Sequence, residues 1–288
     1  MENLIIKSPA KINLFLKVVK KLPNGYHELD TAFQLIDVFD TIEFQNSSNK
    51  ISVFCSDTSI DEEENIIFKA ASILKKVSDR NVGVDIKITK NIPIGAGLGG
   101  GSSNAASTIC ALNKMWDLRL SLNEMMLIGL DLGADVPLFI KGENAYAGGV
   151  GEKLVEKKPI DEKLIIISPD ILNSTEEMFN LYDIQEGPTE LFSQQNSFWK
   201  VFVEKNEEIK EFYEQYAKKF EICLSGTGSS MFIKYNNNSE KQKILKTICV
   251  VKQGVCYENS RPVKSPLISY SGIITNFKLQ LLYFGIYI

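Results

Sequence analysis

Residues 93–106 carry the feature that most restricts how this chain can fold. They read Pro-Ile-Gly-Ala-Gly-Leu-Gly-Gly-Gly-Ser-Ser-Asn-Ala-Ala, with five glycines in the seven residues from Gly95 to Gly101. Such a stretch has few side chains to bury, so its glycines serve backbone geometry and allow another molecule to approach the main chain. The alternating run 84–88 predicts a strand before it, and the apolar run 104–112 predicts a helix after it. Together they place free N–H groups and the positive end of a helix dipole at one point, which predicts a phosphate-binding site.

The loop differs from the common phosphate-binding motifs. A Walker loop requires a lysine directly after its glycines, and here Ser102 follows Gly101. The spacing of the dinucleotide fingerprint occurs from Gly95 to Gly100, but the rest of that fingerprint's context is missing. The alternative is a flexible glycine linker, although linkers are rarely flanked by a strand and a long apolar helix. The phosphate-binding interpretation is therefore preferred.

Composition limits the possible classes of protein. The 288 residues leave room for two domains or one large one, and 44% hydrophobic with 24% charged residues is typical of a globular protein. No dense basic patch with interleaved aromatic residues indicates a nucleic-acid partner. Five scattered cysteines and a single histidine argue against a disulfide framework or a zinc site, and they favour a reducing cytoplasm. The N-terminus lacks the apolar core of a signal peptide, and the apolar run 281–288 is too short to span a membrane, so we expect a packed strand or a disordered end there.

Hydrophobic patterns predict a mixed α/β chain. Residues 4–6 and 12–19 form either a strand pair or one long strand bent at Pro9. Rising charge over 156–158, followed by Pro159, predicts a domain boundary that separates residues 1–160 from 161–288. Further strands are expected at 33–39, 41–44, 51–55 and 164–168, a hairpin at 146–152, short apolar runs at 222–224, 231–235 and 247–251, and helices at 65–77, 122–132, 176–181, 197–220 and 239–246.

Two polar residues in the first predicted strand share one face. Lys11 and Asn13 alternate with Ile12 and Leu14, so both point to the same side of a strand. Most lysines in such a position are surface charges. The neighbouring Asn13 makes a polar pocket an equally good interpretation.

Three further segments carry groups with possible chemistry. Tyr26 and His27 follow the turn signal Asn24-Gly25, and their rings either pack in a hairpin or stack on a nucleobase. Asp135 directly precedes an apolar run, where a carboxylate needs a partner, and acts either as a helix N-cap or as a general base beside a lysine. The second glycine turn, 225–230, is a weak signal for closure over a substrate phosphate.

Taken together, these motifs resemble a known superfamily. Residues 8–13, 93–103 and 224–228 fall in the order and spacing of the three motifs of the small-molecule kinases named for galactokinase, homoserine kinase, mevalonate kinase and phosphomevalonate kinase. Residues 24–29 and 133–137 resemble the branch whose alcohol substrate carries a cytidine diphosphate group. The resemblance spans about residues 5 to 265. It implies an α/β (α+β) fold of two domains, with an N-terminal part like the second domain of ribosomal protein S5 and a ferredoxin-like C-terminal part.

The resemblance also implies an activity and a set of site residues. The activity is ATP-dependent phosphorylation of the 2-hydroxyl of a methylerythritol that carries cytidine diphosphate, in the non-mevalonate route to isoprenoid precursors. Lys11 and Asp135 match the catalytic pair. The ATP-binding positions are Pro93, Ile94, Gly95, Ala96, Gly97, Leu98, Gly99, Gly100, Gly101, Ser102 and Ser103, and the substrate-binding positions are Asn13, Tyr26, His27, Thr175, Phe179, Gly226, Thr227 and Gly228.

No residue is assigned as a protein ligand of a metal. Mg²⁺ is expected to arrive with ATP, with water or a hydroxyl of Ser102 or Ser103 completing its coordination. We expect a cytoplasmic monomer or homodimer that binds neither nucleic acid nor membrane.

Two alternatives remain open. One is another kinase of the superfamily, of the homoserine or mevalonate type, but those substrates have no base on which Tyr26 and His27 could stack. The other is a non-catalytic nucleotide-binding protein, for which Lys11 and Asp135 would not be required.

Overall fold

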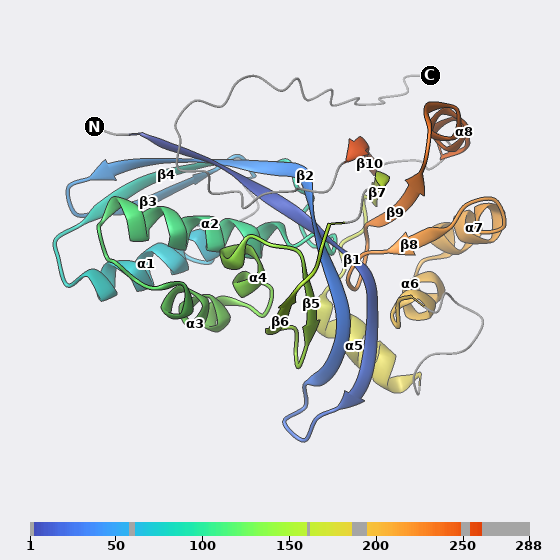
Figure 1. The fold of residues 1–288 in the computed structure, drawn as a ribbon, viewed down its shortest axis with the longest axis horizontal. Coiled ribbons are helices and arrows are strands. Elements are labelled where there is room, and N and C mark those ends of the chain that lie inside the picture. Colours follow the sequence, from blue (N-terminus) through green and yellow to red (C-terminus); the bar gives the residue numbers. More distant parts are fainter. Residues whose placement is uncertain (1–2, 58–60, 160–161, 186–194, 249–253, 261–288) are drawn as a thin grey trace.

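The residues that the structure describes form two β-sheets with helices gathered around each. A computed structural model describes residues 3–57, 61–159, 162–185, 195–248 and 254–260. Figure 1 shows α1–α4 on the side of the first sheet and α5–α8 on the side of the second. The predicted boundary between residues 160 and 161 falls between the last strand of the first sheet and the first strand of the second. Both residues lie outside the described ranges, and the boundary stays a prediction.

Within the described ranges, the first sheet has six strands. Their order is β3-β4-β2-β5-β6, with β1 paired to β2, and only β3 and β4 run parallel. The strands are β1 (Leu4–Lys21), β2 (His27–Ser47), β3 (Ile51–Cys55), β4 (Gly83–Thr89), β5 (Ala145–Gly148) and β6 (Lys153–Glu156), and the helices beside them are α1 (Ile66–Ser78), α2 (Gly100–Met115), α3 (Leu122–Leu132) and α4 (Val136–Lys141).

The second sheet has four antiparallel strands in the order β10-β7-β9-β8. Its strands are β7 (Lys163–Pro169), β8 (Ile222–Leu224), β9 (Met231–Tyr235) and β10 (Gly254–Ser260), and its helices are α5 (Thr175–Ile184), α6 (Trp199–Lys205), α7 (Glu207–Tyr216) and α8 (Asn238–Ile248). Of the predicted apolar run 247–251, the first two residues end α8, and 249–251 lie outside the described residues, as does the tail 281–288.

A long two-stranded ribbon connects the first sheet to the second half of the molecule. β1 is one continuous strand whose pairing with β2 shifts register between Pro9 and Ala10, so the bent-strand alternative is correct. A proline lacks an N–H group, so it favours such an irregularity in the ladder. Beyond the bend, the ribbon continues to a turn at residues 22–26, at the bottom of Figure 1.

Both sheets share a central apolar cluster. Ala10 and Ile12 of β1 pack there with Leu164 and Ile166 of β7 and with Phe232 of β9. The residues that alternate with them along β1 are therefore directed to the opposite face of the ribbon.

Local capping signals explain where several helices begin and end. Asn65 caps α1 by accepting a hydrogen bond from the N–H of Ile67 at 3.0 Å, and Ser121 and Glu124 form a reciprocal capping box on α3. Both helices match their predicted ranges closely. The prediction of a single helix over 197–220 is wrong, because the segment divides into α6 and α7 at Asn206, whose backbone is extended. The side-chain amide of Asn206 donates to the carbonyl of Phe202 at 2.8 Å and so gives a hydrogen-bond donor to one of the last carbonyl groups of α6.

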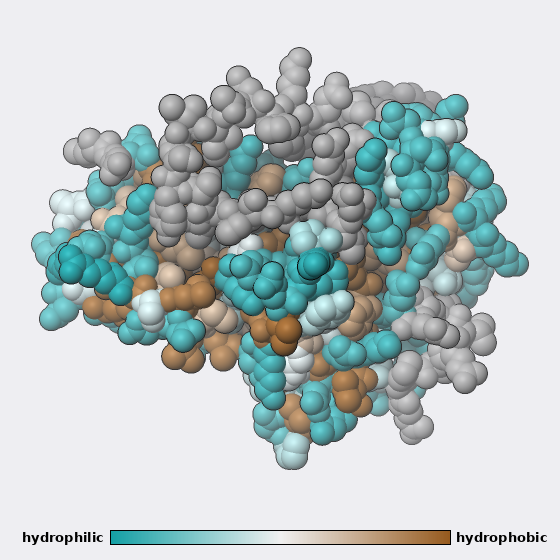
Figure 2. All heavy atoms as spheres, in the orientation of Figure 1, coloured by the Kyte–Doolittle hydropathy of each residue, from teal (hydrophilic) through white to brown (hydrophobic). Residues whose placement is uncertain are grey.

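The surface in this view is mostly hydrophilic. Figure 2 shows brown side chains gathered where α3 lies, and three leucines of that helix, Leu122, Leu127 and Leu130, are exposed. Among the described residues, no helix combines the length and the apolar character needed to cross a membrane.

Candidate active site

The glycine loop lies between β4 and α2, as the sequence predicts. Gly97 has φ +73°, and a Cβ built there would lie 2.3 Å from the carbonyl oxygen of Ser225. Gly99 has φ +70°, caps α2, and would place a Cβ 2.9 Å from the ring of Phe139. Side chains are therefore excluded at both positions by conformation and by space.

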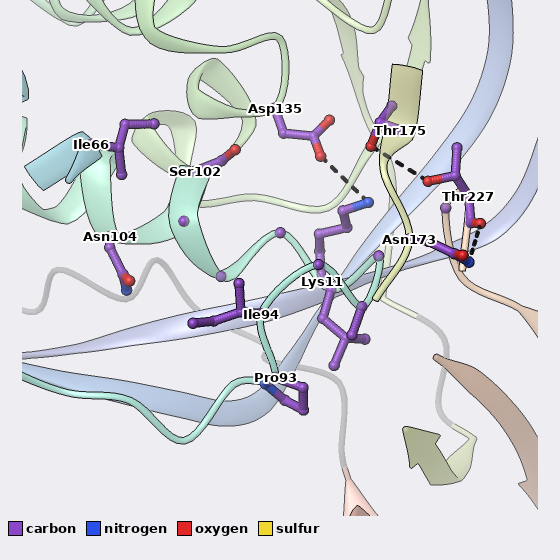
Figure 3. Close-up of a pocket in the computed structure, with 18 of the residues that line it drawn as sticks. Lys11, Ile66, Pro93, Ile94, Ser102, Asn104, Asp135, Asn173, Thr175 and Thr227 are labelled. Atoms are coloured by element: carbon purple, nitrogen blue, oxygen red, sulfur yellow. Dashed lines mark hydrogen bonds and ion pairs between the residues drawn. The ribbon is translucent and has the colours of Figure 1, made fainter. Parts of the chain in front are cut away.

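The start of α2 forms one wall of a pocket. Gly100, Gly101 and Ser102 occupy the first turn of this helix, where N–H groups have no partner within the helix. The pocket has a volume of about 480 Å³ and is lined by residues of β1 to β4, of the glycine loop, of α5 and of the turn after β8. Figure 3 shows Lys11 and Asp135 between the glycine loop and Thr175.

Lys11 and Asp135 meet in this pocket. Lys11 Nζ lies 3.4 Å from Asp135 Oδ2, and the two side chains are 5% and 30% exposed. Lys11 Nζ also donates to Asn13 Oδ1 at 2.7 Å, and the Asn13 amide donates in turn to Thr31 Oγ1 at 2.8 Å. Because Thr31 is itself bonded to the carbonyl of Phe15, the chain of bonds holds Asn13 in one orientation. Lys11 is therefore part of a polar pocket and not a surface charge.

Asp135 occupies the N-cap position of α4, as the helix-cap interpretation predicts, but its side chain makes no capping hydrogen bond. The apolar residues that follow it, from Val136 to Ile140, are all buried and fix the helix in the core. This anchoring places the carboxylate at the pocket, where its ion-pair partner is Lys11.

A buried polar cluster beneath the loop is absent from the sequence-based site. Asp40 is fully buried and accepts hydrogen bonds from the N–H groups of Asn91 and Ile92, at 2.7 and 2.9 Å. It also pairs with Lys90 Nζ and accepts from the Asn104 amide at 3.0 Å. Asp40 thus ties the entry of the glycine loop to the first turns of α2. The available signal was a carboxylate that interrupts the apolar run from 33 to 44.

The pocket also has an apolar end that the sequence analysis missed. Cys55, Ile66 and Ile88 supply its apolar lining, and Glu64, Asn65 and Lys90 supply polar groups around it. Figure 3 shows Ile66 on the opposite side of Lys11 from Thr175 and Thr227. The three apolar residues come from β3, α1 and β4, which only the tertiary fold brings beside the loop.

The second glycine turn docks against the first. Ser225 Oγ donates to the carbonyl of Gly97 at 3.0 Å, and the N–H of Ser230 donates to the carbonyl of Ala96 at 3.0 Å. Gly226, Thr227 and Gly228 consequently line the pocket. Thr175 Oγ1 lies 3.5 Å from Thr227 Oγ1, so the structure brings these predicted substrate residues together.

The predicted aromatic residues are only partly gathered. Phe179 lines the pocket, and the ring of His27 stacks on it with centroids 4.7 Å apart and an interplanar angle of 26°. His27 Nε2 lies 2.7 Å from Asp183 Oδ1. Tyr26 sits at the end of the ribbon with its side chain largely exposed, outside the pocket lining.

Ser103 is not brought into the pocket. Its N–H donates to the carbonyl of Gly99 at 2.9 Å, and its hydroxyl hydrogen-bonds with Ser8 Oγ at 2.7 Å. It is fully buried, whereas the neighbouring Ser102 lines the pocket. The polar groups of Ser103 are therefore already used within the protein.

Comparison with known proteins supports the kinase interpretation. The family model described as GHMP kinases N terminal domain matches residues 65–143. A crystal structure of 4-(cytidine 5'-diphospho)-2C-methyl-D-erythritol kinase is 25% identical with a TM-score of 0.75, covering 90% of this chain and 100% of that one. A homoserine kinase from Cytophaga hutchinsonii, 14% identical, has a TM-score of 0.70 over 91% of this chain and 96% of its own, which shows the fold alone.

Relatives in sequence narrow the assignment from the kinase superfamily to one family of kinases. The fold is that of the small-molecule kinases that the sequence resembles, so the expected α/β kinase fold is confirmed. The 4-diphosphocytidyl-2-C-methyl-D-erythritol kinase of Acinetobacter baylyi is 38% identical over 242 residues, which cover 79% of this chain and 85% of the relative. This chain belongs to the 4-diphosphocytidyl-2-C-methyl-D-erythritol kinase family and is an ATP-dependent phosphotransferase.

Proposed function

We propose that this kinase transfers the γ-phosphoryl group of ATP to the 2-hydroxyl of 4-diphosphocytidyl-2-C-methyl-D-erythritol. The observation that carries the proposal is the ion pair between Lys11 and Asp135, held at 3.4 Å in the pocket that the glycine loop lines. Family membership and the name of the relatives favour the cytidyl substrate over homoserine or mevalonate. The product class places the enzyme in the non-mevalonate route to isoprenoid precursors.

The glycine loop is proposed to hold the phosphates of ATP. All residues from Pro93 to Ser102 line the pocket. The N-terminus of α2, the positive end of the helix dipole, faces the same pocket. Main-chain N–H groups and a helix N-terminus together favour anionic ligands. We propose that the adenine of ATP binds at the apolar end formed by Cys55, Ile66 and Ile88, because the flat faces of a base pack against apolar side chains.

Asp135 and Lys11 are proposed to carry out the transfer. Phosphoryl transfer depends mainly on positioning and on neutralisation of charge. Asp135 accepts the proton of the attacking hydroxyl as a general base. Lys11 stabilises the charge on the attacking oxygen or on the phosphoryl group in transit, and Asn13 keeps the ammonium group in place.

Mg²⁺ is proposed to enter with the nucleotide. Among the described residues, no group of three or more His, Cys, Asp and Glu side chains is arranged to hold a metal. The Ser102 hydroxyl does line the pocket, and a hard oxygen donor of this kind fits Mg²⁺. The ion, when bound, supplies neutralisation of the charge on the phosphates.

The substrate's base is proposed to meet the aromatic residues at the other end of the site. Phe179 and Thr175 line the pocket there, with His27 stacked on Phe179. Tyr26 is exposed and free to cover a base that enters beside these rings. Gly226, Thr227 and Gly228 are proposed to contact the substrate between the base and Lys11.

The remaining proposals concern the whole chain. We propose a cytoplasmic enzyme, because its cysteines follow the pattern of a protein from a reducing compartment. It is proposed to act as a monomer or homodimer, without nucleic acid, and with a domain division between residues 160 and 161.

One assay tests the proposed function. Release of ADP is measured with the cytidyl substrate, homoserine and mevalonate offered in parallel, and D135N serves as the background control. Turnover with the cytidyl substrate alone is the expected result. Preferential turnover of homoserine or mevalonate overturns the substrate assignment, and ATP binding without turnover of any of the three overturns the assignment as a kinase for these alcohols.

A further inference from the structure

One helix holds the ring of His27 on two sides. Phe179 and Asp183 are four residues apart on α5 and therefore share one face of the helix. Phe179 stacks on the face of the imidazole, and Asp183 Oδ1 lies 2.7 Å from Nε2 at its edge. His27 begins β2, directly after the turn of the long ribbon, so these contacts fix the end of the ribbon against α5 (Figure 1).

The charge of Asp183 determines which nitrogen of His27 carries a proton. Lys21 Nζ donates to Asp183 Oδ2 at 2.6 Å. This hydrogen bond, with a further one to His27, holds the pKa of Asp183 below its usual range. An ionised carboxylate only accepts hydrogen bonds, so Nε2 of His27 must be the donor.

The second ring nitrogen is left for another partner. The His27 side chain is only 6% exposed, and none of the hydrogen bonds within the described residues uses Nδ1. In a neutral imidazole protonated on Nε2, Nδ1 is an acceptor. His27 does not itself line the pocket, but its imidazole packs against Phe179, which does.

We propose that Asp183 is a positioning residue for recognition of the substrate's base. It keeps the proton of His27 on Nε2 and the ring flat against Phe179, and thereby reserves Nδ1 for the base. Lys21 holds the carboxylate in the orientation that this requires. The inference rests on the proposed function, in which His27 meets the base of the substrate.

Three variants test this assignment. D183A removes the acceptor, and D183N keeps the shape and a weaker neutral acceptor. E177Q is the matched control, because Glu177 also lies on α5 and also binds a lysine, Lys205, at 2.7 Å, but does not contact His27. His27 is the only histidine in the chain, so its ring nitrogens give unambiguous signals in ¹⁵N NMR spectra.

The expected results separate positioning from general loosening. In the parent protein, the ring is protonated on Nε2, and in D183A the form protonated on Nδ1 becomes populated. The KM for the cytidyl substrate rises roughly tenfold in D183A and less in D183N, whereas kcat and the KM for ATP stay within about twofold. E177Q matches the parent in every measurement.

Unchanged ring signals in D183A overturn the proposal, and so does a tautomer change that leaves the KM for the cytidyl substrate unaltered. An equal rise in both KM values also overturns it, because that result indicates loss of structure. The NMR measurement needs no substrate. If the parent does not turn over the cytidyl substrate, the proposed function is wrong. The NMR spectra then still test separately whether Asp183 keeps the proton of His27 on Nε2.

Discussion

At the scale of single residues, the site depends on a few side chains whose partners are distant in the sequence. Lys11 is held by Asn13 and by Asp135, and Asp135 reaches the pocket because α4 is anchored in the core. Neighbouring groups determine the orientation of each of these side chains. Substitution of one side chain at a time therefore tests one proposed role, such as proton acceptance or contact with the base.

Replacement of Asp135 by asparagine tests the general base. We expect D135N to lower kcat by at least about two orders of magnitude, because a positioned base contributes roughly 10²–10⁴-fold. Binding of ATP, measured by calorimetry, is expected to stay near the parent value, since the loop that holds the phosphates is untouched. A kcat near that of the parent would show that another group accepts the proton.

Replacement of Tyr26 by alanine tests the proposed cover over the base. The side chain is 65% exposed, so the thermal midpoint should change little. If the ring stacks on the base, binding of the cytidyl substrate weakens by roughly 1–3 kcal/mol, which appears as a higher KM. An unchanged KM removes Tyr26 from the substrate site.

Two buried thiols should resist alkylation. Burial raises the pKa of Cys110 and of Cys223 from 9.0 to about 12, so neither is a thiolate near pH 8. Peptide mass spectrometry after iodoacetamide treatment should find Cys55, which lines the pocket, labelled far faster than either. Rapid labelling of Cys110 in the folded protein at pH 8 would contradict the burial.

The same two thiols make the free energy of unfolding depend on pH. In the unfolded chain they ionise near pH 9, whereas in the folded protein they stay protonated to about pH 12. Their contribution to the free energy of unfolding is therefore fully present below pH 9 and is lost as the pH rises toward 12.

At the scale of elements, the glycine loop acts as a rigid connection between β4 and α2. Asp40 fixes its beginning, the turn at 225–230 supports its middle, and Gly99 caps the helix at its end. Only some of its glycines are required by the fold. The others leave space that a ligand can occupy.

Alanine at two positions distinguishes these roles. Gly97→Ala should lower the thermal midpoint and weaken ATP binding, because its Cβ meets the backbone of Ser225 at 2.3 Å and its φ is +73°. Gly101→Ala is the control: nothing lies within 4 Å of its Cβ, so the thermal midpoint should be retained. A loss of ATP affinity in G101A at unchanged stability would support close approach of the phosphates to the helix. Equal stability of G97A and the parent would contradict the tight contact.

At the scale of the whole molecule, the pocket exists because the two sheets pack together. Ser225 belongs to the turn after β8 and is fully buried, and its hydroxyl bridges to Gly97 in the loop of the first sheet. The same hydroxyl accepts from the N–H of Asn13 at 3.3 Å. One side chain thus connects the phosphate loop, the strand that carries Lys11 and the second sheet.

Ser225→Ala should therefore couple stability to nucleotide binding. Loss of buried hydrogen bonds costs about 1–3 kcal/mol in the free energy of unfolding, and we expect a several-fold rise in the KM for ATP. Ser121→Ala is the matched control, since loss of the capping box of α3 costs about 0.5–2 kcal/mol away from the pocket. The control should leave the KM for ATP unchanged. Equal KM values in S225A and S121A would show that the bridge to Gly97 does not support the loop.

Local pattern alone was sufficient for much of this protein. The glycine loop, the strand before it and the helix after it, the range of α3, and the shared face of Lys11 and Asn13 all follow from short-range spacing and backbone conformation, which neighbouring residues specify. The resemblance implied that Lys11 and Asp135 form a pair, and the structure brings them together. Tertiary structure alone decided that Ser103 turns inward to Ser8 while Ser102 lines the pocket, that Asp40 lies beneath the loop, and that the helix expected at 197–220 divides at Asn206. The physical reason is that burial and hydrogen-bond satisfaction depend on groups far apart in the chain, which meet only when both sheets have packed.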